Sequence, residues 1–218
     1  MDLNKVIKER CCTRNFTDEL PVKEQITAII EAGRLAPSYV NVQPWHFIVV
    51  QDKETIKLLG ELAYNQAHVV NANTIIVCCG TLDSWELENY KQTILSRPNI
   101  SEDKLNYLLT NPGFCPKLLG DETIKLRTLE ELTYAVAYMT LEIENQGLAG
   151  CIVGGMGNPL TKNNMDVYKE VCKKLELPET VMIMSMLIVG YPNEEKPAKI
   201  RKSLSEISSF NKFGHPYL

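Results

Sequence analysis

The longest regular pattern in the chain, residues 121–148, predicts a long helix at the centre of the folded core. Its apolar side chains recur at intervals of three and four residues, the spacing that places them on one face of a helix. These side chains belong to Leu129, Leu132, Val136, Met139 and Ile143. Gly147 stands where the glycine of a helix C-terminal cap is expected. Other helices or strands must cover the apolar face of such a helix, and 218 residues are enough to bury a sizeable core around it.

Shorter helix-like and strand-like segments alternate on both sides of this helix. Strand patterns occupy residues 45–52, 73–81, 149–155 and 180–192, and helix patterns occupy residues 3–10, 22–36, 53–67 and 164–177. The strand at 73–81 is apolar throughout, so we expect it to be buried on both faces, with Cys78 and Cys79 in the core. The alternation predicts one α/β or α+β domain that covers residues 1–218.

Two segments lack this regularity. Residues 83–120 contain short helix patterns at 85–95 and 102–109, separated and followed by loop-forming sequence. An insertion of this size is either a lid or binding loop, or a peripheral excursion. Residues 193–218 are polar, charged and aromatic without periodicity, which indicates either a disordered tail or an arm that lies on a partner subunit.

Charge and cysteine content exclude several classes of protein. A net charge of -4 argues against a general nucleic-acid binder, because no excess of Lys and Arg is available to displace counterions from phosphates. The longest apolar run, residues 180–192, is shorter than the about 18 residues of a membrane span. Residues 1–10 do not resemble a secretory signal. Seven cysteines without a C-x-x-C pair fit a reducing compartment, so we expect a cytoplasmic protein.

No standard catalytic motif is present. The chain has no G-x-G-x-x-G, G-x-x-x-x-G-K-[ST] or G-x-S-x-G sequence, and its three histidines do not have the spacing of metal ligands. We therefore predict no metal site and no catalytic side chain, and expect any chemistry to come from an organic cofactor.

Two basic pairs are candidates for binding a phosphate. Arg10 and Arg14 lie four residues apart, and Lys199 and Arg201 follow the last strand. The planar guanidinium group suits a phosphate, although each pair taken alone is more simply explained as solvated surface charge. Residues 36–50 favour phosphate binding over solvated surface charge, because in this segment uncharged amides beside a proline lead into a buried strand. Such amides suit a ring with carbonyl and nitrogen edges.

These segments resemble, in order along the chain, the FMN-dependent nitroreductase family of flavoproteins. The sequence RCCTRNF is similar to that family's opening Arg-x-Ser-x-Arg-x-Phe element. The match is most specific in APSYVNVQPWHF, which resembles the family's Ala-Pro-Ser-x-x-Asn-x-Gln-Pro-Trp-x-Phe element. ENQGLAGCIVGG and LIVGYPNEEKPAKIRKSL resemble a helix-to-strand segment and the C-terminal element, whereas residues 83–120 match poorly.

The resemblance implies an α+β fold, with a central, mostly antiparallel sheet flanked by helices and a C-terminal arm, residues 193–218, on the partner subunit. It implies a single FMN-binding domain whose variable, lid-like insertion is residues 83–120. It further implies a homodimer with two FMN sites at the subunit interface. NADH or NADPH would be the co-substrate.

The resemblance also assigns roles to residues. Arg10 and Arg14 would hold the FMN phosphate, closed by Lys199 and Arg201, with Cys11 and Cys12 as neighbours of the anion. Cys12 stands where the family has serine, and a thiol is the weaker donor; a reactive thiol is the alternative reading. The remaining contacts to the flavin implied by the resemblance are Ser38, Asn41, Gln43 and Pro44 from the partner subunit, and Asn65, His68, Ile152, Val153, Gly154 and Gly155.

Three functions are compatible with this assignment. The first is a ping-pong oxidoreductase that passes two electrons from NADH or NADPH to a nitroaromatic, a quinone or an activated alkene. The second is a relative on the same fold that dehalogenates iodotyrosine or modifies the flavin. The third is a flavin-binding or sensing protein without turnover.

Overall fold

The computed structural model describes residues 2–196 and 198–217. Its helices are α1 (Leu3–Glu9), α2 (Lys23–Arg34), α3 (Lys53–Leu62), α4 (Ala67–Val70), α5 (Leu87–Leu95), α6 (Glu102–Thr110), α7 (Asp121–Asn145), α8 (Met165–Lys174) and α9 (Leu204–Ile207), with short turns η1 (Tyr39–Asn41), η2 (Leu82–Trp85) and η3 (Pro116–Leu119). Its strands are β1 (Trp45–Val50), β2 (Ile75–Thr81), β3 (Ala149–Val153) and β4 (Val181–Gly190).

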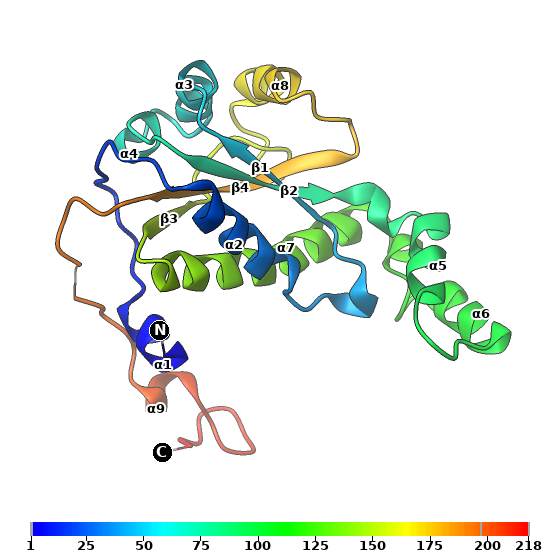
Figure 1. The fold of residues 1–218 in the computed structure, drawn as a ribbon. Helices are drawn as coiled ribbons and strands as arrows, with labels where there is room; N and C mark the ends of the chain where they lie inside the picture. The colour runs from blue at the N-terminus through cyan, green and yellow to red at the C-terminus, as the bar shows by residue number, and fades with distance from the viewer. Residues whose placement is uncertain (1, 197, 218) are drawn as a thin grey trace.

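Within the described residues, the four strands form one sheet in the order β1-β2-β4-β3, and each neighbouring pair is antiparallel. Helices α2 and α7 cover one face of the sheet, and α3, α4 and α8 lie over the other (Figure 1). Residues 75–80 of β2 are therefore all buried, as predicted for a strand covered on both faces. The predicted α+β fold with a central antiparallel sheet flanked by helices is confirmed.

Helix α7 crosses the sheet beside α2 and buries the face predicted from its spacing (Figure 1). Leu132, Val136, Met139 and Ile143 are each no more than 4% exposed. The helix ends where Gly147 adopts a φ of 74°, which lets the Leu148 amide donate to the Ile143 carbonyl at 3.0 Å. The predicted cap is thus confirmed.

The helix expected over residues 53–67 is shorter than predicted. Ile56, Leu59 and Leu62 are buried as that pattern requires, but α3 ends at Leu62. Tyr64 and Asn65 have φ values of 56° and 55°, in the left-handed region that stops a right-handed helix. The four-residue helix α4 then starts in a new direction at Ala67.

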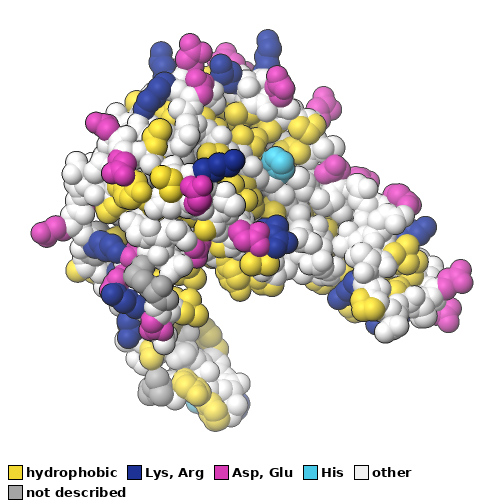
Figure 2. All heavy atoms as spheres, viewed as in Figure 1, with side chains coloured by type: hydrophobic (Ala, Val, Ile, Leu, Met, Phe, Trp, Pro, Cys, Tyr) yellow, Lys and Arg dark blue, Asp and Glu magenta, His cyan; other side chains and the backbone are white. Residues whose placement is uncertain are grey.

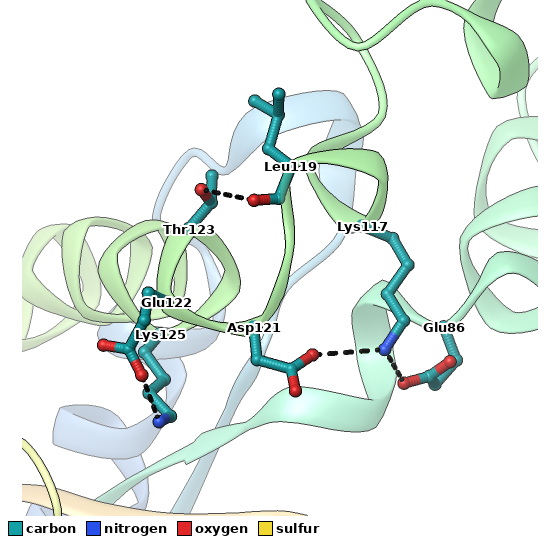
Figure 3. A network of polar contacts seen from close by, with 7 residues as sticks. All are labelled: Glu86, Lys117, Leu119, Asp121, Glu122, Thr123 and Lys125. Atoms are coloured by element: carbon teal, nitrogen blue, oxygen red, sulfur yellow. Dashed lines mark hydrogen bonds and ion pairs between the residues drawn. The ribbon is translucent and has the colours of Figure 1, made fainter.

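The insertion at residues 83–120 is a helical unit that projects from one end of the sheet (Figure 1). Its buried residues Trp85, Tyr90, Ile94 and Cys115 form a second, small core together with Val42 and with Ile124 of α7. Trp85 precedes α5 rather than starting it, because its buried indole N–H donates to Thr128 Oγ1 of α7 at 2.8 Å. Lys117 fastens the end of the insertion by pairing with Glu86 at 2.7 Å and Asp121 at 3.5 Å (Figure 3).

The tail after β4 runs along the opposite end of the molecule toward α1, and α9 and the C-terminus project beyond the body (Figure 1). Its apolar side chains are exposed; Ile200 is 90% exposed and Phe213 is fully exposed. Hydrophobic side chains are visible along this projection and on the adjacent underside of the body (Figure 2). The predicted domain and arm include Met1, Pro197 and Leu218, which lie outside the described residues. No helix in residues 2–196 and 198–217 is both long and apolar enough to cross a membrane.

The core of the insertion predicts unequal effects of two identical substitutions. The buried Tyr90 hydroxyl donates to the Phe114 carbonyl at 2.6 Å, whereas the exposed Tyr107 hydroxyl bonds to nothing in the described part of the chain. Tyr90→Phe should lower the free energy of unfolding by about 1 kcal/mol, and Tyr107→Phe by less than about 0.5 kcal/mol. Urea denaturation of both variants measures the difference, and equal losses would contradict the packing described.

Candidate functional site

The N-terminal segment 10–16 lies along the outer edge of β3. Cys12 pairs with Gly150 in a parallel bridge, and the Thr13 amide donates to the Gly150 carbonyl at 3.2 Å. A side chain at position 150 would place its Cβ 2.9 Å from the Ile188 carbonyl oxygen of β4, so glycine permits the close approach of β3 to β4 at the point where the N-terminal segment pairs. The pairing holds Arg10, Cys12 and Arg14 at one edge of the sheet.

The tail brings two further cations to the same edge. Lys199 Nζ donates to the Ile7 carbonyl at the end of α1 at 2.8 Å. Partial desolvation, followed by the charges of Arg10 and Arg201, lowers the Lys199 pKa. Arg10 and Arg14 both lie close enough to Cys151 to oppose the rise in the pKa of that thiol, which burial and the neighbouring Cys12 thiol bring to about 11.

We call Arg10, Arg14, Lys199 and Arg201 the basic group. In the described part of the chain, none of these four side chains forms an ion pair with a carboxylate. Like charges that lie close together disfavour one another, and a bound anion relieves that repulsion. The structure places Arg10 and Arg201 near Lys199, and it places Arg10, Arg14 and Cys12 near Cys151. Cys11 is buried.

Glu194 positions Arg14 through the backbone, a role that was not evident from its place in a polar tail. Its carboxylate accepts from the Arg14 amide at 2.7 Å and from Asn15 Nδ2 at 2.6 Å. These two bonds lower the Glu194 pKa. The Asn193 amide also donates to the Asn15 carbonyl at 2.9 Å, so the tail and the N-terminal segment form one unit.

A hollow of about 540 Å³ opens beside this unit. It is lined by Arg14, Asn15, Phe16, Ala67, His68, Asn71 and Asn193. Partial burial and the charge of Arg14 lower the His68 pKa, which favours the neutral form of this imidazole. Three asparagines in the hollow had no sequence signal, because isolated amides in turns and tails look like ordinary surface. Asn65 does not line this hollow; it is exposed on the preceding turn.

The four predicted residues of β3 and the following turn do not share one surface. Ile152 is 43% exposed and, with Gly154, lines a second hollow of about 440 Å³ against α7 and β4. Val153 points into the core. The Gly155 carbonyl accepts from Gln66 Nε2 at 2.8 Å, which ties this turn to the start of α4.

Segment 38–44 has an unusual backbone. Val40, Asn41 and Gln43 have φ values of 54°, 65° and 46°, in a region that non-glycine residues seldom occupy. The Ser38 hydroxyl accepts from the Gln43 amide at 3.0 Å, and the Thr81 amide donates to the Pro44 carbonyl at 3.0 Å. The Asn41 and Gln43 side chains are left exposed, whereas Pro44 is buried.

The basic group and segment 38–44 lie at opposite ends of the sheet. Phe16 pairs with Pro192 beyond the end of β4, whereas Pro44 bonds to Thr81, which pairs with Val181 at the start of β4. The ten residues of β4 span roughly 30 Å at about 3.3 Å per residue. One chain therefore does not bring the two sets of predicted residues to one place.

Comparisons with known proteins show the family of the chain and its fold. The model of the nitroreductase family matches residues 7–191. The chain is 29% identical over 203 residues to an FMN reductase [NAD(P)H] of Bacillus subtilis, covering 91% of this chain and 70% of that protein. It is 26% identical over 211 residues to an iodotyrosine deiodinase of Thermotoga neapolitana, covering 97% and 98%. A solved nitroreductase-like protein of Streptococcus mutans shares the fold with a TM-score of 0.79 at 19% identity, covering 97% and 98%.

The Glu194 contacts predict a pH-dependent contribution to stability. A carboxyl whose pKa is lowered in the folded state stabilises that state above its unfolded pKa, and this stabilisation is lost as the pH falls through the folded pKa. Glu194→Gln should therefore lower the melting temperature near neutrality by about 1–2 °C, a small value because the group is exposed. The difference in melting temperature between this variant and the unmodified protein should become smaller at acidic pH. Glu195→Gln is the matched control, and an equal loss there would contradict the assignment.

Proposed function

Because the chain belongs to the nitroreductase family, we propose that it binds FMN and passes two electrons by a ping-pong mechanism from NADH or NADPH to a nitroaromatic, a quinone or an activated alkene. It is an oxidoreductase, as its family and its relatives indicate. The observation that supports the proposal is the basic group, none of whose four cations forms an ion pair with a carboxylate in the described residues.

The residues of the basic group fit the FMN phosphate. A phosphate monoester carries up to two negative charges and accepts several hydrogen bonds, so it matches two guanidinium groups and an ammonium group. A bound phosphate would stabilise the charged form of Lys199 in particular. Burial and neighbouring cations lower the Lys199 pKa, and the negative charge of a phosphate opposes the effect of those cations. Cys12 would contribute a weak donor where a hydroxyl donates better.

Segment 38–44 would serve the flavin of a second subunit. It lies roughly 30 Å from the basic group along β4, yet both sets belong to the inferred cofactor site. A two-fold dimer joins such separated halves, because a symmetric interface places each half of one subunit beside the other half of its partner. The exposed apolar side chains of Ile200, Leu204, Ile207, Phe210, Phe213 and Tyr217 support an arm that is covered by that partner.

FMN, when bound, supplies the hydride chemistry between the nicotinamide and the acceptor. The protein would orient the flavin ring and exclude water from it. Asn41 and Gln43 offer exposed amides for the polar edges of the ring, and Ile152 offers an exposed apolar surface. Glycines 154 and 155 are exposed and permit close approach of the backbone. His68, whose neutral form is favoured, would donate one hydrogen bond rather than a full positive charge. Asn65 and Val153 remain part of the proposed site only by resemblance.

A second candidate is reductive dehalogenation. It is favoured by the similarity to the Thermotoga protein named as an iodotyrosine deiodinase, which covers nearly the whole chain. The helical unit at residues 83–120 would then act as the lid that selects the acceptor, and the small core that it shares with Val42 and Ile124 makes it able to hold a defined shape. A screen of acceptors that includes iodotyrosine separates the two reactions. A flavin sensor would accept no electrons from NADH or NADPH at a useful rate.

We place the protein in the cytoplasm as a single domain over residues 1–218. All seven cysteines are unpaired, which suits a reducing compartment.

The proposed function predicts a coloured protein. Purified protein should carry FMN or take up added FMN, and anaerobic NADH or NADPH should bleach its visible absorption within the mixing time of a stopped-flow instrument or shortly after. Adding a quinone or nitroaromatic should restore the colour. A protein that holds FMN but is not bleached by either nucleotide would be a sensor, and the proposed turnover would be wrong.

The basic group predicts selectivity for the phosphate. Arg14→Ala should weaken FMN binding by about 1.5–3 kcal/mol, the value of a charge-assisted hydrogen bond, and leave riboflavin binding unchanged because riboflavin has no phosphate. Arg34→Ala is a suitable control, since Arg34 pairs with Glu31 on the surface of α2. Calorimetry measures both affinities. Equal affinity of the unmodified protein for FMN and riboflavin would rule out this role.

A further inference from the structure

Glu131 is a buried acid with a single hydrogen-bond partner in the described residues. It lies on α7 and is 2% exposed, and its carboxylate accepts from the Tyr39 amide at 2.9 Å. Burial raises its pKa, and the Tyr39 bond and Arg127 act against that rise. Arg127 does not neutralise it directly, because that guanidinium donates to Glu130 at 2.7 Å. Burying a carboxyl group costs free energy of folding unless hydrogen bonds compensate, so the bond to the Tyr39 amide is the contact that explains this position.

The bond to Glu131 lies at the entrance to segment 38–44. Tyr39 directly precedes Val40 and Asn41, the first two residues with positive φ, and Gln43 is the third. Such backbone conformations persist only where surrounding contacts impose them. The Tyr39 amide is the one main-chain group of this segment that is held by a buried acidic side chain in the described part of the chain.

The same tyrosine connects the segment to the insertion. Its hydroxyl donates to the Phe114 carbonyl at 3.3 Å, and the Arg127 guanidinium lies 5.8 Å from the centre of its ring. Val42 is buried in the core of the insertion. Glu131 thus fixes the main chain at a point where the exposed amides and the insertion meet.

We propose that Glu131 is a positioning residue for the flavin ring: its carboxylate holds the Tyr39 amide and thereby keeps Ser38, Asn41 and Gln43 in the geometry that contacts the partner subunit's FMN. This inference rests on the proposed function, because it requires segment 38–44 to contact the flavin. It assigns to Glu131 an effect on the ring, whereas the basic group acts on the phosphate. The two effects are separable with riboflavin.

The test compares Glu131→Ala, Glu131→Gln and Met139→Ala in flavin-free protein. Met139 is a fully buried residue of α7 that touches neither the segment nor the hollows described above, so it controls for general loss of stability. FMN and riboflavin are titrated separately and followed by flavin fluorescence, and the melting temperature of each variant is recorded.

Glu131→Ala should weaken both flavins by the same factor, roughly tenfold, because an amide that loses its buried acceptor no longer holds the strained backbone. Glu131→Gln keeps an acceptor oxygen and should bind both flavins within about threefold of the unmodified protein. Met139→Ala should lower the melting temperature without changing either affinity. If Glu131→Ala does not fold, Glu131→Met, which preserves more of the volume, replaces it.

Unchanged affinity in the alanine or methionine variant would overturn the inference. So would a glutamine variant as weak as the alanine variant, or an equal loss of affinity in Met139→Ala, because either result indicates a general structural effect. Loss of FMN binding with riboflavin unaffected would assign Glu131 to the phosphate and also overturn it. An unmodified protein that binds neither flavin would instead overturn the proposed function itself.

Discussion

The crossing of the N-terminal segment over the residues that follow β4 is the constraint on which the candidate site depends. Backbone hydrogen bonds from Thr13 to Gly150, Thr17 to Tyr191 and Asn193 to Asn15 join these segments, and Glu194 adds its carboxylate. Together they fix Arg14 at the edge of the sheet where Arg10 also lies, and the tail brings Lys199 and Arg201 near Arg10. A group of cations without direct ion pairs is well suited to an anionic cofactor.

The second constraint is distance. The sheet separates the basic group from segment 38–44 by the length of β4, so the proposed cofactor site would need two subunits. On this proposal, the unusual backbone at Val40, Asn41 and Gln43 serves a contact outside its own chain, and Glu131 holds the segment from within. The insertion packs on the same segment through Tyr39 and Val42, so changes in the insertion would alter the surroundings of the flavin.

Sequence patterns predicted the elements whose pattern is set by burial. The spacing of apolar residues in α7 and the apolar run of β2 were sufficient to predict these two elements. The ordered motifs led to the basic group and segment 38–44, whose role in binding FMN stays a prediction. Sequence did not predict features that depend on three-dimensional neighbours. Glu194 sits in a polar tail, and Glu131 occupies a buried position of α7 that only its contact with Tyr39 explains. The early end of α3 was missed because Tyr64 and Asn65 give no strong local signal for a left-handed turn.

The central claim, that each flavin site combines the basic group of one subunit with segment 38–44 of its partner, is tested most directly with a mixed dimer. One subunit carries Arg14→Ala and the other carries Glu131→Ala, each with a different affinity tag so that only mixed dimers are purified. The account predicts that FMN titration finds one site per dimer with the affinity of the unmodified protein, because one site receives both intact halves and the other receives neither. Two sites that are both weakened, and none with the affinity of the unmodified protein, would show that each site lies within a single chain and would contradict the account.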